Sequence, residues 1–105
     1  MNFETLEFEK KNNCGYITLN RPERLNSFDM KLGIELYEIL KKFSIDSDIK
    51  VVILKGTGKG FCGGGDVKEM HKTFDKPKFL RDLTKAIHKC VLEMRNMEKP
   101  VIAAV

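Results

Sequence analysis

Residues 51–66 read VVILKGTGKGFCGGGD and join a short β-branched run to a glycine-rich loop. The run at 51–54 has no polar alternation, which is typical of a parallel strand covered on both faces. Six of the chain's eight glycines follow within ten residues, at positions 56, 58, 60, 63, 64 and 65. Glycine is entropically unfavourable inside helices and strands, so this stretch is predicted to be a loop that lets a ligand approach the backbone or needs positive φ.

Upstream, the sequence predicts a hairpin of two strands. Residues 3–10 alternate imperfectly between apolar and polar side chains, and residues 16–19 form a second short apolar run. Asn12, Asn13 and Gly15 are expected to form the turn between them.

An amphipathic helix is predicted next. Pro22 breaks the second strand because proline has no N–H donor. Ser27 and Asp29 are both suitable N-caps, and the helix is expected to end near Ser44. Its apolar residues recur at helical spacing at Leu32, Leu36, Leu40 and Phe43. The stripe of Leu32, Leu36 and Leu40 is predicted to be core. A strand, a helix and the strand at 51–54 in this order imply a right-handed crossover.

Downstream of the loop, a short helical turn is predicted at 66–71, interrupted at 75–77. A longer helix then runs to about residue 97, with apolar residues at helical spacing: Phe79, Leu83, Ile87, Val91 and Met94. Of these, Leu83, Ile87 and Met94 are predicted to be core. Residues 101–105 are predicted to be another buried parallel strand. Since a domain rarely ends inside a buried strand, residues 1–105 are expected to be the N-terminal part of a single domain that continues in the natural protein.

Composition narrows the class of protein. The 105 residues are 42% hydrophobic and 32% charged, as in ordinary globular proteins, and no apolar run reaches the ~20 residues of a membrane span. No signal segment opens the chain, which predicts a cytoplasmic protein that does not bind membranes.

The net charge of +4 comes from lysines dispersed among acidic residues, which argues against nucleic-acid binding and fits a ligand with a few phosphates. Three cysteines in no CxxC spacing are expected to be reduced thiols, with no metal site.

The glycine loop allows two interpretations. A strand followed by a glycine-rich loop and the first turn of a helix forms a site for an anion or a carbonyl oxygen, because unpaired N–H groups point out of the loop. Residues 58–63 match GxGxxG, which would indicate a dinucleotide site. Against this, Pro77 cuts the following helix, and no strand precedes Asp82, where the ribose-binding acid would lie.

The second interpretation rests on two motifs and their spacing. Residues 19–27 read LNRPERLNS, and residues 60–67 read GFCGGGDV after the helix and the strand. This arrangement resembles the crotonase (enoyl-CoA hydratase/isomerase) superfamily over nearly the whole chain. Residues 99–105 also resemble the family's segment before its second glycine-rich turn.

The resemblance implies an α/β fold, the crotonase-like (ClpP/crotonase) spiral of ββα units, of which this chain would be the N-terminal part. It implies an enzyme that binds acyl-CoA thioesters, with coenzyme A as part of the substrate and no other cofactor. Hydration of a 2-enoyl-CoA is the first expectation, with a double-bond isomerase, a thioester hydrolase and a non-catalytic CoA-binding fragment as alternatives. Homotrimers or hexamers are expected for the complete protein.

The resemblance also assigns residues to roles. Gly65 would donate one backbone N–H to the thioester oxygen. Arg24, Leu25 and Ser27 would lie beside the pantetheine and phosphates, and the backbone of Gly63, Gly64, Asp66 and Val67 would line the adenine and thioester end. Glu23 stands where the family often has a basic residue, and the family's catalytic glutamates have no counterpart within residues 1–105.

Other reactive side chains have simpler interpretations. Glu69 is expected to be an exposed first-turn residue, and His71 and His88 are expected to be surface residues. Cys62 could be a nucleophile activated by the loop amides, but a small buried packing residue is favoured. Asp66 is expected to cap the short helical turn, which would also shape the loop.

Overall fold

The computed structural model describes residues 2–66, 71–72 and 75–105. Its sheet has four strands in the order β1-β2-β3-β4. The strands are β1 (Leu6–Lys11), β2 (Cys14–Leu19), β3 (Val51–Gly56) and β4 (Val101–Ala104). β1 and β2 are antiparallel, whereas β2, β3 and β4 are parallel neighbours.

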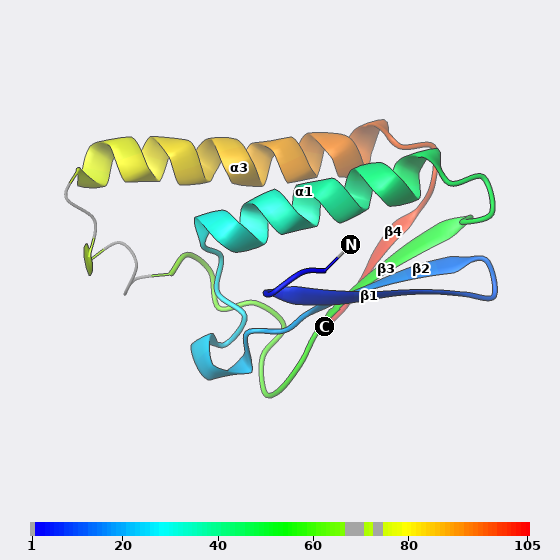
Figure 1. Ribbon diagram of the computed structural model, residues 1–105, viewed down its shortest axis with the longest axis horizontal. Coiled ribbons are helices and arrows are strands. Elements are labelled where there is room, and N and C mark those ends of the chain that lie inside the picture. Colours follow the sequence, from blue (N-terminus) through cyan, green and yellow to red (C-terminus); the bar gives the residue numbers. More distant parts are fainter. Residues whose placement is uncertain (1, 67–70, 73–74) are drawn as a thin grey trace.

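Two long helices, α1 (Met30–Ile45) and α3 (Lys76–Asn96), lie side by side over one face of the sheet (Figure 1). A short 3-10 helix, η1 (Pro22–Arg24), connects β2 to α1. The predicted strands and long helices are confirmed, and their ends agree within a few residues. The turn predicted at 66–71 lies largely outside the described residues.

The β1–β2 turn is formed by two asparagines. Asn12 and Asn13 have φ angles of 52° and 64°. Two successive positive φ angles match the twist of a tight hairpin, and asparagine tolerates them better than most residues. The expectation that Gly15 belongs to this turn is wrong, because Gly15 lies within β2. A Cβ there would come within 2.6 Å of the Phe43 ring, so the missing side chain lets α1 pack closely on the strand.

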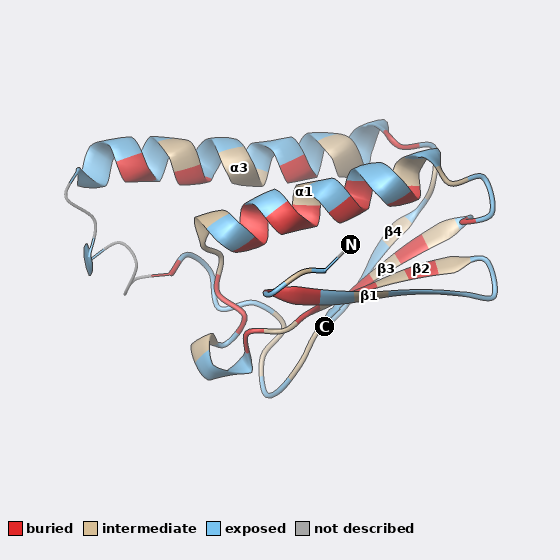
Figure 2. Ribbon diagram, in the orientation of Figure 1, coloured by how far each residue is buried: buried red, intermediate tan, exposed pale blue. Residues whose placement is uncertain are grey.

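The core lies between the sheet and the helices (Figure 2). Alternate residues of β2 and β3 point at α1, so Ile17, Leu19 and Val52 are almost fully buried. The predicted apolar face of α1 is buried against them, and its members are Leu32, Leu36, Ile39, Leu40 and Phe43. On α3, Phe79, Leu83 and Cys90 are buried, whereas Ile87 and Met94, which were predicted to be core together with Leu83, are only half-buried. Val91 lies to one side of that stripe and is 43% exposed.

The opposite face of the sheet carries no second layer among the described residues. Val51 and Ile53 are therefore only half-buried, and Ile102 of β4 is 52% exposed. The parallel pairing of β3 and β4 is confirmed, but the prediction that both strands are covered on both faces is wrong for this chain. The physical reason is that both long helices lie on the same face.

Half-buried polar side chains fix both ends of α1. Asp29 caps its start by accepting a hydrogen bond of 2.8 Å from the Leu32 N–H, which selects Asp29 from the two predicted N-caps. At its end, the Lys99 ammonium donates to the Phe43 carbonyl and, at 2.6 Å, to the Asp46 carbonyl. A cation at this position also interacts favourably with the negative end of the helix dipole.

Glu35, on the buried side of α1, ties the chain's first residues to the helix. Its carboxylate accepts hydrogen bonds from the Thr5 N–H at 2.8 Å and the Thr5 hydroxyl at 2.6 Å, and from the Glu4 N–H at 3.1 Å. Burial by itself would raise the pKa of Glu35, but these hydrogen bonds outweigh it and lower the pKa below its ordinary value.

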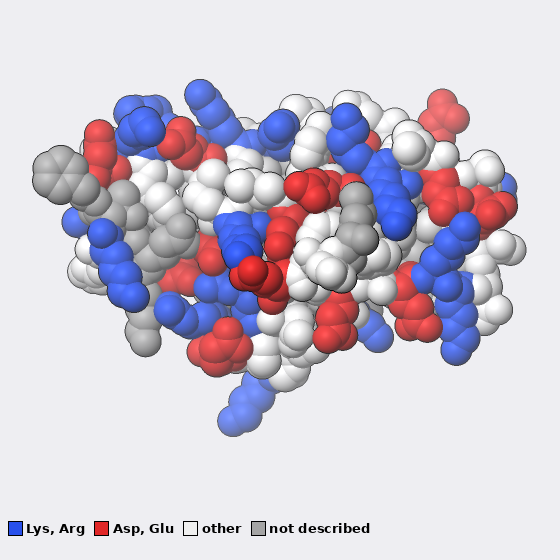
Figure 3. Space-filling model, in the orientation of Figure 1, with Lys and Arg blue, Asp and Glu red and all other residues white. Residues whose placement is uncertain are grey.

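Charges of both signs are interspersed over the face shown in Figure 3. This pattern agrees with the lysines dispersed among acidic residues in the sequence. In the part of the chain that the structure describes, no helix is long and apolar enough to cross a membrane.

Candidate functional site

The segment between β2 and α1 is a tight coil held by its own backbone. η1 is followed by Leu25 and Asn26, whose φ angles of 53° and 55° are both left-handed. The Asn26 N–H donates to the Arg21 carbonyl at 2.8 Å, and the Ser27 N–H donates to the Arg24 carbonyl at 3.0 Å. The coil leaves the Leu25 side chain 55% exposed at the surface.

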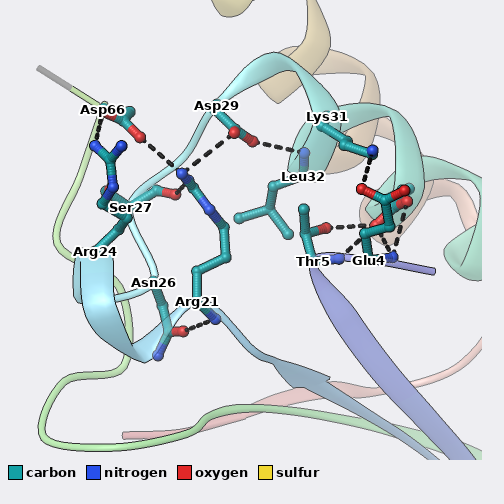
Figure 4. Close-up of polar contacts among 11 residues, drawn as sticks. Glu4, Thr5, Arg21, Arg24, Asn26, Ser27, Asp29, Lys31, Leu32 and Asp66 are labelled. Atoms are coloured by element: carbon teal, nitrogen blue, oxygen red, sulfur yellow. Dashed lines mark hydrogen bonds and ion pairs between the residues drawn. The ribbon is translucent and has the colours of Figure 1, made fainter. Parts of the chain in front are cut away.

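Asn26 joins this coil to the glycine-rich loop. Its side chain is fully buried and its oxygen accepts a hydrogen bond of 2.7 Å from the Arg21 N–H (Figure 4). Its amide nitrogen donates to the carbonyls of Thr57 and Gly60, both at 2.8 Å. One asparagine thus satisfies three backbone groups from two segments that are more than 30 residues apart in sequence.

A short parallel β-bridge then pairs Phe28 with Gly65. The Phe28 N–H donates to the Gly64 carbonyl, and the Asp66 N–H donates to the Phe28 carbonyl at 2.9 Å. Gly64 has a φ of +97°, which L side chains rarely adopt, so glycine is needed there.

The bridge determines where the Gly65 amide points. Phe28 bonds to the residues on either side of Gly65, so the N–H and C=O of Gly65 itself face away from Phe28. Within the described part of the chain, the Gly65 N–H donates no hydrogen bond. The Gly65 N–H is thus an exposed donor, and the hydrogen bonds of Gly64 and Asp66 to Phe28 hold the backbone on either side of it.

Asp66 is buried and its carboxylate lies between two arginines. Arg21 approaches one oxygen at 2.7 Å, and Arg24 approaches the other at 3.3 Å (Figure 4). The Arg21 guanidinium also lies 3.2 Å from the Asp29 carboxylate and donates to the Ser27 carbonyl. The predicted capping role of Asp66 concerns residues outside the described ones and stays a prediction.

A cavity of about 290 Å³ opens where the two motifs meet. Its wall consists of Glu23, Arg24, Leu25, Ser27, Gly63, Gly65 and Asp66. The structure therefore brings together all the predicted site residues except Gly64, which does not line the cavity, and Val67, which lies outside the described residues.

Three residues help to hold the site together in a way that the sequence did not predict. Arg21 and Asn26 do not line the cavity but hold the two segments that do. Asp29 was expected only as a helix cap, yet it also faces Arg21. The signal available in the sequence was a pair of opposite charges, with an arginine in one motif and an aspartate in the other, but the sequence does not say which arginine pairs with it.

Three reactive side chains in the described part of the chain, His71, His88 and Cys62, do not line the cavity. His71 and His88 are exposed, as predicted, while Glu69 falls outside the described residues. Cys62 is exposed rather than buried, because the loop runs over the surface at that point, so the favoured packing interpretation is wrong. Among the described residues, no group of three or more His, Cys, Asp or Glu side chains could hold a metal ion.

The free thiols of Cys62 and Cys90 should differ sharply in reactivity. Cys90 is buried and donates to the Gly33 carbonyl at 3.4 Å, and burial raises its pKa to about 11, against a smaller opposing effect of Lys89. We expect a disulfide-exchange reagent at pH 8 to modify Cys62 rapidly and Cys90 only after denaturation. Because this folded-state pKa lies above the ordinary thiol pKa of 9.0, the contribution of the neutral thiol to stability is lost as the pH rises from about 9 toward 11.

Mass spectrometry of the labelled peptides would check this order, with Cys62→Ser as the control that removes the rapid phase. Labelling of Cys90 in the folded protein at the rate of Cys62 would contradict the packing described for α1 and α3.

Comparison with known proteins places this geometry in a family. Residues 9–105 match the family described as enoyl-CoA hydratase/isomerase. The chain belongs to the enoyl-CoA hydratase/isomerase family. The sequence-based resemblance to the crotonase superfamily is thereby confirmed.

Individual relatives agree with the assignment. A probable mitochondrial enoyl-CoA hydratase of Dictyostelium discoideum is 37% identical over 103 residues, which are 98% of this chain and 36% of the relative. The 1,2-epoxyphenylacetyl-CoA isomerase of Escherichia coli is 37% identical over 91 residues, covering 85% of this chain and 35% of that protein.

A crystal structure of enoyl-CoA hydratase from Mycobacterium smegmatis superposes with a TM-score of 0.88 at 27% identity. The match covers 95% of this chain and 39% of that structure. The crotonase fold is thus confirmed for this chain, which spans between 35% and 39% of the length of these three proteins.

Proposed function

We propose that the whole protein hydrates a 2-enoyl-CoA and that Gly65 supplies one of the donors that stabilise the thioester oxygen. The observation that carries this proposal is the exposed Gly65 N–H, which donates to no group among the described residues, on the wall of a cavity beside Arg24. A backbone amide suits this role because it is a fixed dipole that needs no reorganisation as negative charge develops on the oxygen.

The chemistry follows from the charge that hydration creates. Water adds to the β-carbon of the enoyl group, the electron pair moves to the thioester oxygen as an enolate, and a proton then returns to the α-carbon. A donor aimed at the thioester oxygen stabilises that enolate, and the family membership supports this reaction class.

We propose that the acid/base groups are carboxylates outside the described cavity wall. Of the two acidic residues that line the cavity, Asp66 is engaged by two arginines and Glu23 is exposed on η1. We therefore propose that glutamates elsewhere in the whole protein activate the water and deliver the proton.

For binding, we propose that Arg24, Leu25 and Ser27 contact the pantetheine and phosphates of coenzyme A. The Leu25 side chain is exposed at the cavity, which suits an apolar contact with the pantetheine chain. The backbone of Gly63, Gly64, Asp66 and Val67 would approach the adenine and thioester, with no cofactor beyond the substrate's own coenzyme A.

Steady-state assays of the whole protein with a 2-enoyl-CoA test this function. Loss of the conjugated thioester absorbance with formation of a 3-hydroxyacyl-CoA is the expected result. A shifted double bond would identify an isomerase, and release of free CoA would identify a thioester hydrolase. Binding of CoA without turnover would identify a non-catalytic module, and affinity for NAD without affinity for CoA would overturn the assignment of the cavity.

Glu23 should weaken CoA binding. It places a negative charge on the wall of a cavity in which the Arg24 guanidinium is already paired with Asp66. We expect Glu23→Lys to tighten CoA binding about fivefold at low ionic strength, which corresponds to about 1 kcal/mol for one exposed charge pair. Calorimetric titration at low and high salt checks this, because an exposed electrostatic effect shrinks with screening.

The matched control is Glu98→Lys, which makes the same charge change at an exposed position after α3. Equal tightening by both variants would mean that net charge alone is responsible and that Glu23 does not face the bound CoA.

Assembly and location are also proposals. We propose a homotrimer or a pair of trimers for the whole protein, in keeping with the crotonase resemblance. We also propose a cytoplasmic location, although the Dictyostelium relative is named as mitochondrial. Sedimentation of the whole protein and cell fractionation test these two points.

A further inference from the structure

Arg21 contacts three segments of the chain from a buried position. The residue is 9% exposed and lies just before η1. One terminal nitrogen of its guanidinium is 2.7 Å from the Asp66 carboxylate and 3.2 Å from the Asp29 carboxylate. The other donates to the Ser27 carbonyl. The glycine loop, the start of α1 and the coil between β2 and α1 therefore meet at one side chain (Figure 4).

These contacts lie next to the bridge that orients Gly65. Ser27 directly precedes Phe28, and Asp66 directly follows Gly65, so Arg21 holds the neighbour of each bridged residue. The bridge itself has only two backbone hydrogen bonds and includes two consecutive glycines. Glycine has more conformational freedom to lose than any other residue, so such a bridge needs support from elsewhere.

The guanidinium is suited to this task in a way that other cations are not. Its planar fork presents several N–H donors in fixed directions, whereas a lysine ammonium is a compact charge on a flexible stem. Both carboxylates compensate the buried charge, which would otherwise be costly. Arg21 does not line the cavity, so it acts through other residues and does not touch a ligand there.

We propose that Arg21 is a positioning residue for the oxyanion donor, which holds Ser27 and Asp66 so that the Gly65 N–H is fixed toward the thioester oxygen. This inference rests on the proposed function. Functional groups must be held within about 0.5 Å of their productive geometry, and misplacement by about 1 Å can cost on the order of 10²-fold in rate.

The test compares Arg21→Gln with the wild-type whole protein, using a dienoyl-CoA whose conjugated absorbance shifts to longer wavelength when its carbonyl is polarised. We expect Arg21→Gln to lose most of this shift and to lower kcat on the order of 10²-fold, while the Kd for free CoA stays within about threefold. Arg21→Lys should recover part of the shift, because it keeps the charge and loses the fork. Arg95→Gln, at an exposed position on α3, is the matched control and should behave as wild type.

A full absorbance shift and normal kcat in Arg21→Gln would overturn the inference. So would a loss of CoA affinity in proportion to kcat, which would indicate a purely structural role. If Arg21→Gln does not fold, Arg21→Lys decides: a reduced shift with normal CoA affinity supports the inference, and a full shift overturns it. Absence of any shift in the wild type would instead count against the proposed function itself.

Discussion

Replacing Gly65 by proline should lower kcat of the whole protein for a 2-enoyl-CoA on the order of 10²-fold to 10³-fold, or about 3 kcal/mol of transition-state stabilisation. Proline has no N–H and therefore removes the donor. The bridge to Phe28 uses the Asp66 N–H and the Gly64 carbonyl, not the Gly65 N–H, so the substitution deletes no bridge hydrogen bond.

Gly65→Ala is the matched control for this substitution, because alanine keeps the N–H. A Cβ at this position would meet only the Leu83 side chain, at an ordinary contact distance of 3.9 Å. Near-normal kcat in Gly65→Ala with loss in Gly65→Pro would assign the effect to the amide. Full activity in Gly65→Pro, with CoA affinity unchanged, would refute the role of Gly65.

Replacing Asn26 by alanine should have the largest effect on stability, about 4 kcal/mol. The change leaves the Arg21 N–H and the Thr57 and Gly60 carbonyls without their buried partner. It also puts alanine at a φ of 55°, which by itself costs about 1 kcal/mol or more. The free energy of unfolding from urea titration measures the loss.

Two further variants separate these causes. Asn26→Gly removes the hydrogen bonds but tolerates the positive φ, so it should be about 1 kcal/mol less damaging than alanine. Asn96→Ala, at the exposed end of α3, should change stability by no more than about 0.5 kcal/mol. A loss below about 1 kcal/mol in Asn26→Ala would show that the two segments hold together without this side chain.

Local patterns predicted most of the secondary structure. Apolar spacing placed both long helices, and the glycine run correctly indicated a loop, because these features depend on residues close in sequence. The burial of β3 and β4 was wrong because it depends on which faces the helices cover. Gly15 was misplaced for a similar reason, since its close approach to Phe43 exists only once α1 has packed on the sheet.

The site was predicted through the two motifs, not through its contacts. Both motifs contribute residues to one cavity, among them Arg24, Ser27, Gly63 and Gly65, and the roles of these residues toward a ligand stay predictions. The pairing of Arg21 with Asp66 spans 45 residues of sequence and could not be read from either motif alone. The exposure of Cys62 likewise depends on the path of the loop over the surface.

The structure of the whole protein with an unreactive acyl-CoA thioester bound is the most direct test of the account. We predict that the thioester oxygen lies about 2.7–3.1 Å from the Gly65 nitrogen, with the pantetheine beside Leu25 and Arg24. A thioester oxygen beyond hydrogen-bonding distance of Gly65, or CoA bound away from the cavity between the two motifs, would contradict it.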